Sequence, residues 1–268
     1  MKVLGTAIED LSAAPRSRTV VVSDLHLPAD PSPAFDWLED LLERAARSPS
    51  ETRVVVLGDL FDVWVSDAQL RARAWSRAVA AIAATTARGV DVLVAHGNRD
   101  YMLGARFASV TGCRIVAGGL RLALAGRDAL LLHGDELCTR DLPYQRAKRW
   151  LRHPLTRGFL RVLPARAALF LAARARAQSR AVQSRGTRDS YEATAAAIEA
   201  AFATSSCDVL VHGHVHRAAR TPFGGTREVL VLPAFDEAGV HLVAADGTLG
   251  YRDRHGAPLP DYPPQNWR

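Results

Sequence analysis

The segment TVVVSDLHL, residues 19–27, runs from a stretch of valines directly into Asp24 and His26. Because its apolar residues follow one another without polar alternation, the segment predicts a strand that is buried on both faces. Similar apolar runs recur along the chain: RVVVLGD (53–59), DVLVAHGN (91–98), DALLLHGD (128–135), DVLVHGH (208–214), REVLVLP (227–233) and GVHLVAA (239–245). We therefore expect these runs to form the sheet structure of the protein.

Helical patterns separate the first of these runs. Ser32 and Pro33 form a good N-cap and first-turn pair, and residues 67–88 form an alanine-rich pattern that Gly89 closes. Strands that alternate with helices predict an α/β fold with mainly parallel strands early in the chain. The last two apolar runs have no helical pattern between them, so we expect them to form an antiparallel pair.

The composition narrows the class of protein. The chain has 268 residues, of which 48% are hydrophobic, and this suits one large domain or a domain with an insertion. Its three cysteines are widely separated, which favours a reduced, cytoplasmic protein without a disulfide framework. The N-terminal residues make a poor signal peptide, and no apolar window approaches the roughly 20 residues that cross a bilayer.

The positive charge of the chain is concentrated in one segment. Residues 143–188 hold eleven arginines and one lysine but no Asp or Glu, whereas the whole chain has a net charge of +6. Such a block is typical of a surface that meets phosphates, anionic lipid headgroups or nucleic acid, and the alternative is a solvated arginine-rich face. Apolar residues between Trp150 and Leu171 are interleaved with the arginines, which favours contact with a lipid interface.

This segment lies in a region without predicted strands, which we interpret as a helical insertion. Its expected helical pieces are 143–153, 155–163, 165–184 and 189–204. We divide the chain accordingly into a core (18–142 and 205–250), the insertion (143–204) and two terminal segments (1–17 and 251–268).

Residue types that bind metals gather where five of the predicted strands end. In an open α/β sheet, ligands bind in the crevice beyond the carboxyl ends of the strands. The candidate ligands there are Asp24, His26, Asp59, Asn98, His133, His214 and His216. If Asp59 bridges, each of two metal ions receives four protein ligands. Carboxylate, amide and imidazole donors without thiolate suit Mn, Fe or Zn, and two such ions lower the pKa of a bridging water and clamp a phosphoryl group.

In their order along the chain, the motifs D-x-H, G-D-x-x-D, G-N-x-D, H-G-D and G-H-x-H resemble those of the calcineurin-like metallophosphoesterases. The motifs extend over residues 19–245. The resemblance implies two facing β-sheets flanked by helices, an α/β/β/α arrangement, with a dinuclear metal centre at one edge. The helical insertion then stands where these enzymes would carry a lid.

Longer stretches narrow the resemblance. SDLHL, LGDLFDVWVSD, HGNRDYMLG, HGDELCTRDLPYQ and VHGHVHR are similar to the UDP-2,3-diacylglucosamine diphosphatases of lipid A biosynthesis. This implies hydrolysis of the pyrophosphate bond of UDP-2,3-diacylglucosamine to UMP and 2,3-diacylglucosamine 1-phosphate (lipid X). The nucleophile would be a metal-bridging hydroxide that attacks the alpha phosphorus, with two divalent ions, usually Mn2+. The enzyme would be peripheral at the cytoplasmic face of the inner membrane, with its lid over the acyl chains.

The resemblance also implies roles for individual residues. Asp59, Asn98, Arg99 and His214 would be catalytic, and the metal ligands would be the seven named above. The implied substrate contacts are Asn98, Arg99, Asp141, Tyr144, Arg176, Ser179, Gln183 and His214. In the lid the chain departs from the family pattern, because Gln183 stands where Asn is usual and Gly186 where Lys is usual.

Arg99 gives an independent argument about the substrate. Many metallophosphoesterases carry His after the Gly-Asn pair, where it can protonate an alkoxide leaving group. A guanidinium cannot act as an acid near neutral pH, but it can stabilise charge on a departing phosphate. The second pKa of a phosphate monoester is about 6, so that leaving group needs little protonation. Arg99 therefore favours an anhydride substrate over an alkyl ester.

Two other functions remain open at this point. A metallophosphoesterase for another nucleotide-linked or phosphodiester substrate would use the same ligands, although the insertion has few aromatic residues on which nucleic-acid bases could stack. A scaffold that has lost its metals is the other alternative, and the intact ligand set argues against it. We expect a glycolipid nucleotide and an anionic membrane surface as partners, and neither nucleic acid nor an obligate protein partner.

Overall fold

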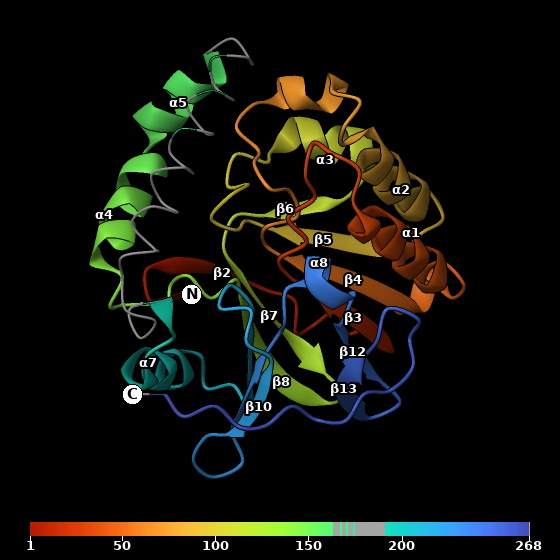
Figure 1. Ribbon diagram of the computed structural model, residues 1–268. Helices are drawn as coiled ribbons and strands as arrows, with labels where there is room; N and C mark the ends of the chain where they lie inside the picture. Colours follow the sequence, from red (N-terminus) through yellow and green to blue (C-terminus); the bar gives the residue numbers. More distant parts are fainter. Residues whose placement is uncertain (163–166, 168–169, 171–173, 175–190, 268) are drawn as a thin grey trace.

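In the computed structural model, which describes residues 1–162, 167, 170, 174 and 191–267, the strands form two sheets (Figure 1). In spatial order, the first sheet contains β13 (Thr248–Arg252), β12 (His241–Ala245), β3 (Arg18–Val22), β4 (Thr52–Leu57), β5 (Asp91–Ala95) and β6 (Arg114–Val116). The second contains β1 (Lys2–Val3), β2 (Thr6–Asp10), β7 (Gly119–Leu124), β8 (Arg127–Leu132), β9 (Val209–His212), β11 (Glu228–Val231) and β10 (Ala219–Pro222).

The valine runs are buried on both faces because each strand of the first sheet contributes to two apolar layers. In β3, Val20 and Val22 belong to the layer between this sheet and the helices, whereas Val21 belongs to the layer between the two sheets. Leu131 of β8 and Val211 of β9 complete the layer between the sheets from the other side. Alternate side chains of a strand point to opposite faces, so a continuous apolar run satisfies both layers.

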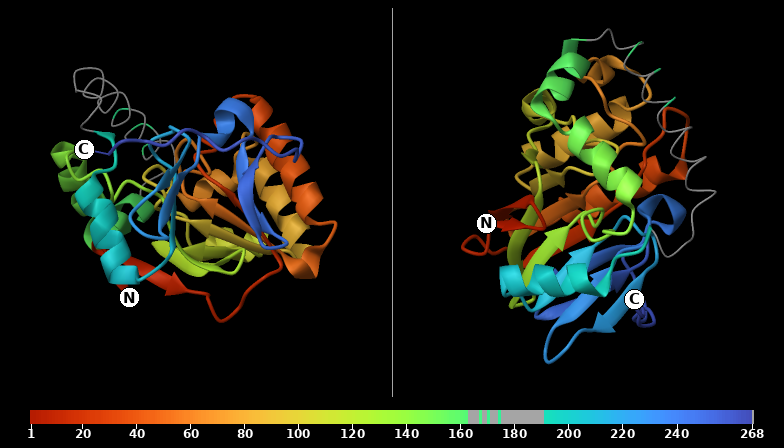
Figure 2. Two further views of the ribbon diagram at one scale, coloured as in Figure 1. Left: turned by 90° about the horizontal axis from the view of Figure 1, so that it is seen from below. Right: turned by 90° about the vertical axis from the view of Figure 1, so that its left-hand side faces the viewer.

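Helices cover the outer faces of both sheets, which confirms the α/β/β/α arrangement. Those against the first sheet are α1 (Pro33–Ala45), α2 (Ser76–Ala87) and α3 (Ala105–Thr111). The outer face of the second sheet is covered by α7 (Ala195–Ser205), and Figure 2 shows α7 and α1 on opposite sides of the sheets. Ser32 caps α1 as predicted, because its hydroxyl accepts a hydrogen bond from the backbone N–H of Ala34.

The predicted helix over 67–88 is divided in two, and this prediction was wrong in its continuity. A short 3₁₀ helix, Asp67–Arg71, precedes α2 and begins with a capping box of Ser66 and Gln69. Trp75 lies between the two helices, and its indole N–H donates a hydrogen bond of 2.9 Å to the backbone oxygen of Leu27. The break lies at Ala72, whose backbone is extended (ψ 127°), and the hydrogen bond then fixes Trp75 at the start of α2.

The expected pairing of the last two apolar runs was also wrong. β11 pairs in parallel with β9 in the second sheet, whereas β12 pairs antiparallel with β3 in the first. Between them, the four-residue helix α8 (Phe235–Ala238) carries the chain from one sheet to the other. An apolar run can complete either sheet, so nearness along the chain did not decide its partner.

Segments outside the predicted core pack against it. β2, from the N-terminal segment, pairs with β7, and α7, from the predicted insertion, buries Ile198 and Phe202 against the second sheet. The helices α4 (Leu142–Leu151) and α5 (Pro154–Val162) follow one another along one side of the molecule in Figure 1. The domain limits themselves stay a prediction.

Replacement of Phe202 by Ala tests whether α7 is part of the folded core. Because the ring is almost fully buried in the layer on the second sheet, we expect the free energy of unfolding to fall by about 3–5 kcal/mol. Chemical denaturation measures the change, with Thr204→Ala, an exposed position of the same helix, as the control. Equal stability of the two variants would show that α7 contributes little to the core.

Candidate metal centre

The seven candidate ligands follow strands whose carboxyl ends lie at one edge of the molecule. Those of the first sheet follow the adjacent parallel strands β3, β4 and β5, and those of the second follow the adjacent parallel strands β8 and β9. The backbone N–H of His214 donates a hydrogen bond of 2.8 Å to Oδ2 of Asp24, which links the two sheets at this edge. The ligands of both sheets thereby face one another.

Most of these residues have a backbone conformation that side chains other than glycine rarely adopt. Left-handed φ angles occur at five of them: Asp24 (+56°), His26 (+41°), Asp59 (+53°), His214 (+66°) and His216 (+55°). Such conformations cost about 1–3 kcal/mol each and persist where the surrounding structure imposes them. Their concentration at one edge indicates that this edge serves a function rather than stability.

The distances between donor atoms match metal binding. One group consists of Asp24, His26 and His216, another of Asp24, Asp59 and His133, and within each group one donor atom per residue lies within 4.8 Å of the others. Asp24 is common to both groups. From the sequence, Asp59 is predicted to bridge the two ions, and this role stays a prediction. Its Oδ2 lies 3.4 Å from Nε2 of His26.

Asn98 and His214 complete the arrangement. Nε2 of His133 lies 3.0 Å from Oδ1 of Asn98, and the imidazole rings of His133 and His214 are 5.1 Å apart between centroids. The structure therefore brings all seven candidate ligands together, although they come from five separate stretches of the chain.

The donor atoms fit a divalent cation. Among the residues that the structure describes, Oδ1 of Asp24 and Nε2 of His26 are buried and have no hydrogen-bond partner. Burial of such polar atoms is unfavourable unless another group compensates them. Both atoms face the centre of the ligand cluster, and a cation bound there would provide that compensation.

The electrostatics of the cluster favour positive charge. Burial by itself would raise the pKa of Asp59, but His133 and His26 outweigh burial and lower it. Burial would likewise lower the pKa of His133, yet Asp59 and Asp24 raise it to about 9. For His214 burial dominates and lowers the pKa to about 4. The carboxylates thus stay ionised and stabilise cations beside them.

Arg99 lies directly against the group of seven candidate metal ligands, which we call the metal cluster. Its backbone N–H donates a 2.9 Å hydrogen bond to Oδ1 of Asp59, and its guanidinium lies 3.2 Å from Oδ2 of the same carboxylate. Asp62 holds the other end of the guanidinium at 2.9 Å, and the N–H of Trp64 donates to the Arg99 carbonyl. Asp62 is the last residue of the G-D-x-x-D motif, but the sequence analysis gave it no role.

Asp135 attaches the insertion to the metal centre, a role that the sequence analysis missed. This fully buried carboxylate, the last residue of H-G-D, contacts three side chains at successive turns of one face of α4. The hydroxyl of Tyr144 donates a hydrogen bond to it, Nζ of Lys148 lies 2.7 Å away and the guanidinium of Arg152 3.7 Å away. Two cations of the basic block therefore pair with Asp135 instead of projecting toward an external anion.

Two of the predicted substrate contacts, Asp141 and Tyr144, lie at the start of α4. Asp141 caps α4, because its Oδ1 accepts a hydrogen bond of 3.1 Å from the backbone N–H of Tyr144. The ring of Tyr144 lies 6.2 Å from that of His214, so α4 begins beside the metal cluster. Arg176, Ser179, Gln183 and Gly186 lie outside the described residues.

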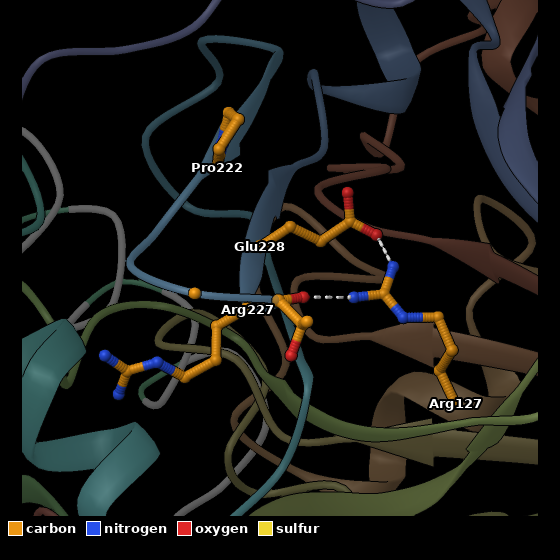
Figure 3. A pocket seen from close by; sticks show the side chains of 6 residues that line it. Arg127, Pro222, Arg227 and Glu228 are labelled. Atoms are coloured by element: carbon orange, nitrogen blue, oxygen red, sulfur yellow. Dashed lines mark hydrogen bonds and ion pairs between the residues drawn. The ribbon is translucent and has the colours of Figure 1, made fainter.

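A surface hollow of about 420 Å³ lies at the opposite end of the second sheet (Figure 3). Its lining residues are Arg127, Pro222, Gly225, Thr226, Arg227 and Glu228. Arg127 begins β8 and pairs with Glu228, which begins β11, whereas the metal ligands follow the other ends of the second sheet's strands. The hollow is therefore separate from the metal cluster, and Arg127, which lines it, is already paired with Glu228.

Comparison with known proteins identifies the family of the chain. The family model described as calcineurin-like phosphoesterase matches residues 17–218. At a TM-score of 0.47 and 13% identity, the chain resembles a dimetal phosphatase structure from Danio rerio, with 90% of this chain and 96% of that chain covered. Because the family model matches more than half of the chain, the fold is that of a calcineurin-like phosphoesterase.

Curated relatives place the chain more closely. UDP-2,3-diacylglucosamine hydrolase of Stutzerimonas stutzeri (strain A1501) is 37% identical over 245 residues, covering 90% of this chain and 98% of that protein. The protein of the same name from Pseudomonas aeruginosa (strain UCBPP-PA14) is 35% identical, covering 81% and 91%. That from Aeromonas salmonicida (strain A449) is 36% identical, covering 85% and 90%. The chain belongs to the calcineurin-like phosphoesterases and, within them, to the UDP-2,3-diacylglucosamine hydrolase family.

Replacement of Gly213 by Ala tests the close approach of the two sheets at the metal cluster. A Cβ at this position would lie 2.1 Å from Oγ of Ser23 and 2.3 Å from Oδ2 of Asp24, so the carboxylate must move. We expect a loss of 1–3 kcal/mol in stability (about the usual cost of overpacking) and at least a tenfold weaker Mn2+ affinity by calorimetry. Gly250→Ala, where a Cβ meets nothing within 4 Å, is the control. Undiminished Mn2+ affinity in Gly213→Ala would contradict the ligand geometry.

Proposed function

We propose that the protein hydrolyses the pyrophosphate bond of UDP-2,3-diacylglucosamine to UMP and 2,3-diacylglucosamine 1-phosphate. The observation that carries the proposal is the convergence of seven metal-ligand candidates with Arg99, which lies 3.2 Å from a carboxylate of the cluster. The names of the curated relatives, which cover most of this chain, support the choice of substrate.

The residues of the centre have separate tasks in this proposal. Two divalent ions, which we propose to be Mn2+, would activate water for attack on the alpha phosphorus. Asp59, Asn98 and His214 would bind the metal ions, and the bound ions would position the reacting phosphate. Asp62 aims the guanidinium of Arg99, which stabilises the charge of the departing phosphate without donating a proton.

We further propose that α4 and α5 meet the lipid part of the substrate and an anionic membrane surface at the cytoplasmic face of the inner membrane. Large apolar side chains are exposed on these helices or follow them in the chain: Trp150 (79%), Leu155 (78%) and Phe159 (58%), with Phe170 (65%) beyond α5. Exposed arginines lie among them, which is the combination that suits a charged lipid interface. In the part of the chain that the structure describes, no helix is long and apolar enough to cross a membrane.

A substrate comparison tests the proposed reaction. With Mn2+, we expect the protein to cleave UDP-2,3-diacylglucosamine at least 100-fold faster than an alkyl phosphate or single-stranded DNA, because Arg99 suits a phosphate leaving group. It should also cleave it faster than UDP-GlcNAc, which has the same leaving-group type but no acyl chains for the exposed apolar residues of the insertion to contact. The measurement is release of UMP from the two UDP-sugars, of inorganic phosphate from the alkyl phosphate and of shorter fragments from the DNA. Asp59→Asn, which alters a proposed ligand, should abolish cleavage of the lipid nucleotide. A rate on the alkyl phosphate equal to that on the lipid nucleotide would reject the proposal.

Replacement of Phe159 and Phe170 by Ser tests the lipid-facing role of the insertion. Both rings are more than half exposed, so we expect the fold to persist and kcat/KM for the diacylated substrate to fall at least tenfold. Cleavage of UDP-GlcNAc should stay at its low wild-type rate. Val110→Ser, an exposed apolar position on α3, is the control. An unchanged kcat/KM for the lipid substrate in the double variant would contradict the lid proposal.

A further inference from the structure

Asp236 contacts the metal cluster although it belongs to none of the motifs. Its Oδ2 lies 3.2 Å from Nδ1 of His26, a residue 210 positions earlier in the chain. Asp236 lies on α8, the short helix after β11, and its side chain is 31% exposed. We propose that Asp236 is a positioning residue, which orients the imidazole of His26 for metal binding; this inference rests on the metal centre of the proposed function.

The helix α8 is attached to the turn that carries the ligands, so the contact is not accidental. The backbone N–H of Phe235 lies 3.1 Å from the carbonyl oxygens of both Ser23 and Asp24. The ring of Phe235 is fully buried and packs edge-on against Trp37 at 6.4 Å. Gly239 ends the helix with a φ of +68°, where a Cβ would lie 3.3 Å from the Trp37 ring. These contacts hold Asp236 at a fixed distance from His26.

The contact determines which nitrogen of His26 is available to a metal. A neutral imidazole has one N–H and one nitrogen lone pair. When the carboxylate of Asp236 accepts the hydrogen of Nδ1, the lone pair is at Nε2. That atom lies 3.4 Å from Oδ2 of Asp59 and 3.8 Å from Oδ1 of Asp24, within the metal cluster.

Without Asp236, the same two carboxylates would favour the wrong tautomer. A proton on Nε2 would be attracted by Asp24 and Asp59, and that proton would occupy the position of the metal. A carboxylate on the far nitrogen of a metal-binding His opposes this by fixing the tautomer and the ring orientation. Asp236 thus counteracts the protonation of Nε2 that Asp24 and Asp59 would otherwise favour.

Two of the other ligand histidines, His133 and His216, are held differently from His26. Nδ1 of His133 lies 3.0 Å from the backbone oxygen of Leu57. His216 contacts Asp24, itself a proposed ligand. Within the described ranges, Asp236 is the carboxylate outside the proposed ligand set that pairs with a ligand imidazole.

Metal affinity tests the inference independently of activity. Titration of metal-stripped full-length protein with MnCl2 in a calorimeter should give a Kd about 10–100-fold weaker for Asp236→Ala than for wild type, the usual effect of losing such a partner. Asp236→Asn, whose amide oxygen can still accept from Nδ1, should stay within a few-fold of wild type. Glu237→Ala removes an exposed carboxylate from the same helix and should change nothing. At saturating Mn2+, kcat of Asp236→Ala should recover.

A long-range nitrogen NMR spectrum of the protein with Zn2+ gives a second readout, because it reports which nitrogen of His26 carries hydrogen. We expect a sharp Nδ1–H signal in the wild type, where the hydrogen bond to Asp236 slows exchange with water, and loss of that signal by exchange broadening in Asp236→Ala. Where the Ala variant fails to fold, Asp236→Ser, whose hydroxyl is too short to reach Nδ1, serves in its place with the same expected loss.

The outcomes separate this inference from the proposed function. Wild-type protein that binds no Mn2+ overturns the metal centre and the inference with it. Wild-type binding with equally tight binding by Asp236→Ala overturns the role of Asp236 alone. An Asn variant as weak as the Ala variant also overturns it, because the effect would then come from charge instead of orientation.

Discussion

The buried carboxylate of Asp24 joins the two sheets, and the rest of the site is arranged around it. Its Oδ2 accepts hydrogen bonds from the hydroxyl of Ser23 beside it and from the backbone N–H of His214 in the other sheet. Its Oδ1 faces the imidazole of His216 at 3.3 Å. A buried carboxylate is stable only when it is paired, so this residue requires both the second sheet and positive charge on its remaining side.

Several of the proposed ligands adopt an unfavourable backbone conformation. Five of them have left-handed φ angles, which carry an energetic cost for residues other than glycine. Three apolar layers offset that cost, since valine and leucine fill both faces of the central strands. The fold therefore concentrates its strain at the strand ends and its stability in the strands themselves.

The insertion combines two kinds of contact. On one face of α4, Tyr144, Lys148 and Arg152 hold the helix to Asp135 beside the metal cluster. Elsewhere on α4 and α5, large apolar residues such as Trp150 and Phe159 are exposed. The polar attachment of α4 does not use these exposed apolar side chains, whereas Leu160 of α5 packs against the core.

The sequence by itself determined the strands β3, β4, β5, β8, β9, β11 and β12, because runs such as TVVVSD indicate a doubly buried strand, whereas shorter or alternating strands such as β2, β7 and β10 were not predicted. The residue types at the strand ends also predicted the ligand set. The role proposed for Arg99 likewise rests on its residue type, because a guanidinium cannot donate a proton near neutral pH. Only the tertiary structure decided that β11 and β12 belong to different sheets, that Asp135 binds the cations of α4 and that Asp236 reaches His26. Strand patterns and motifs are local, whereas the partner of a strand edge or a carboxylate is whatever the folded chain brings within about 3 Å, the range of a hydrogen bond.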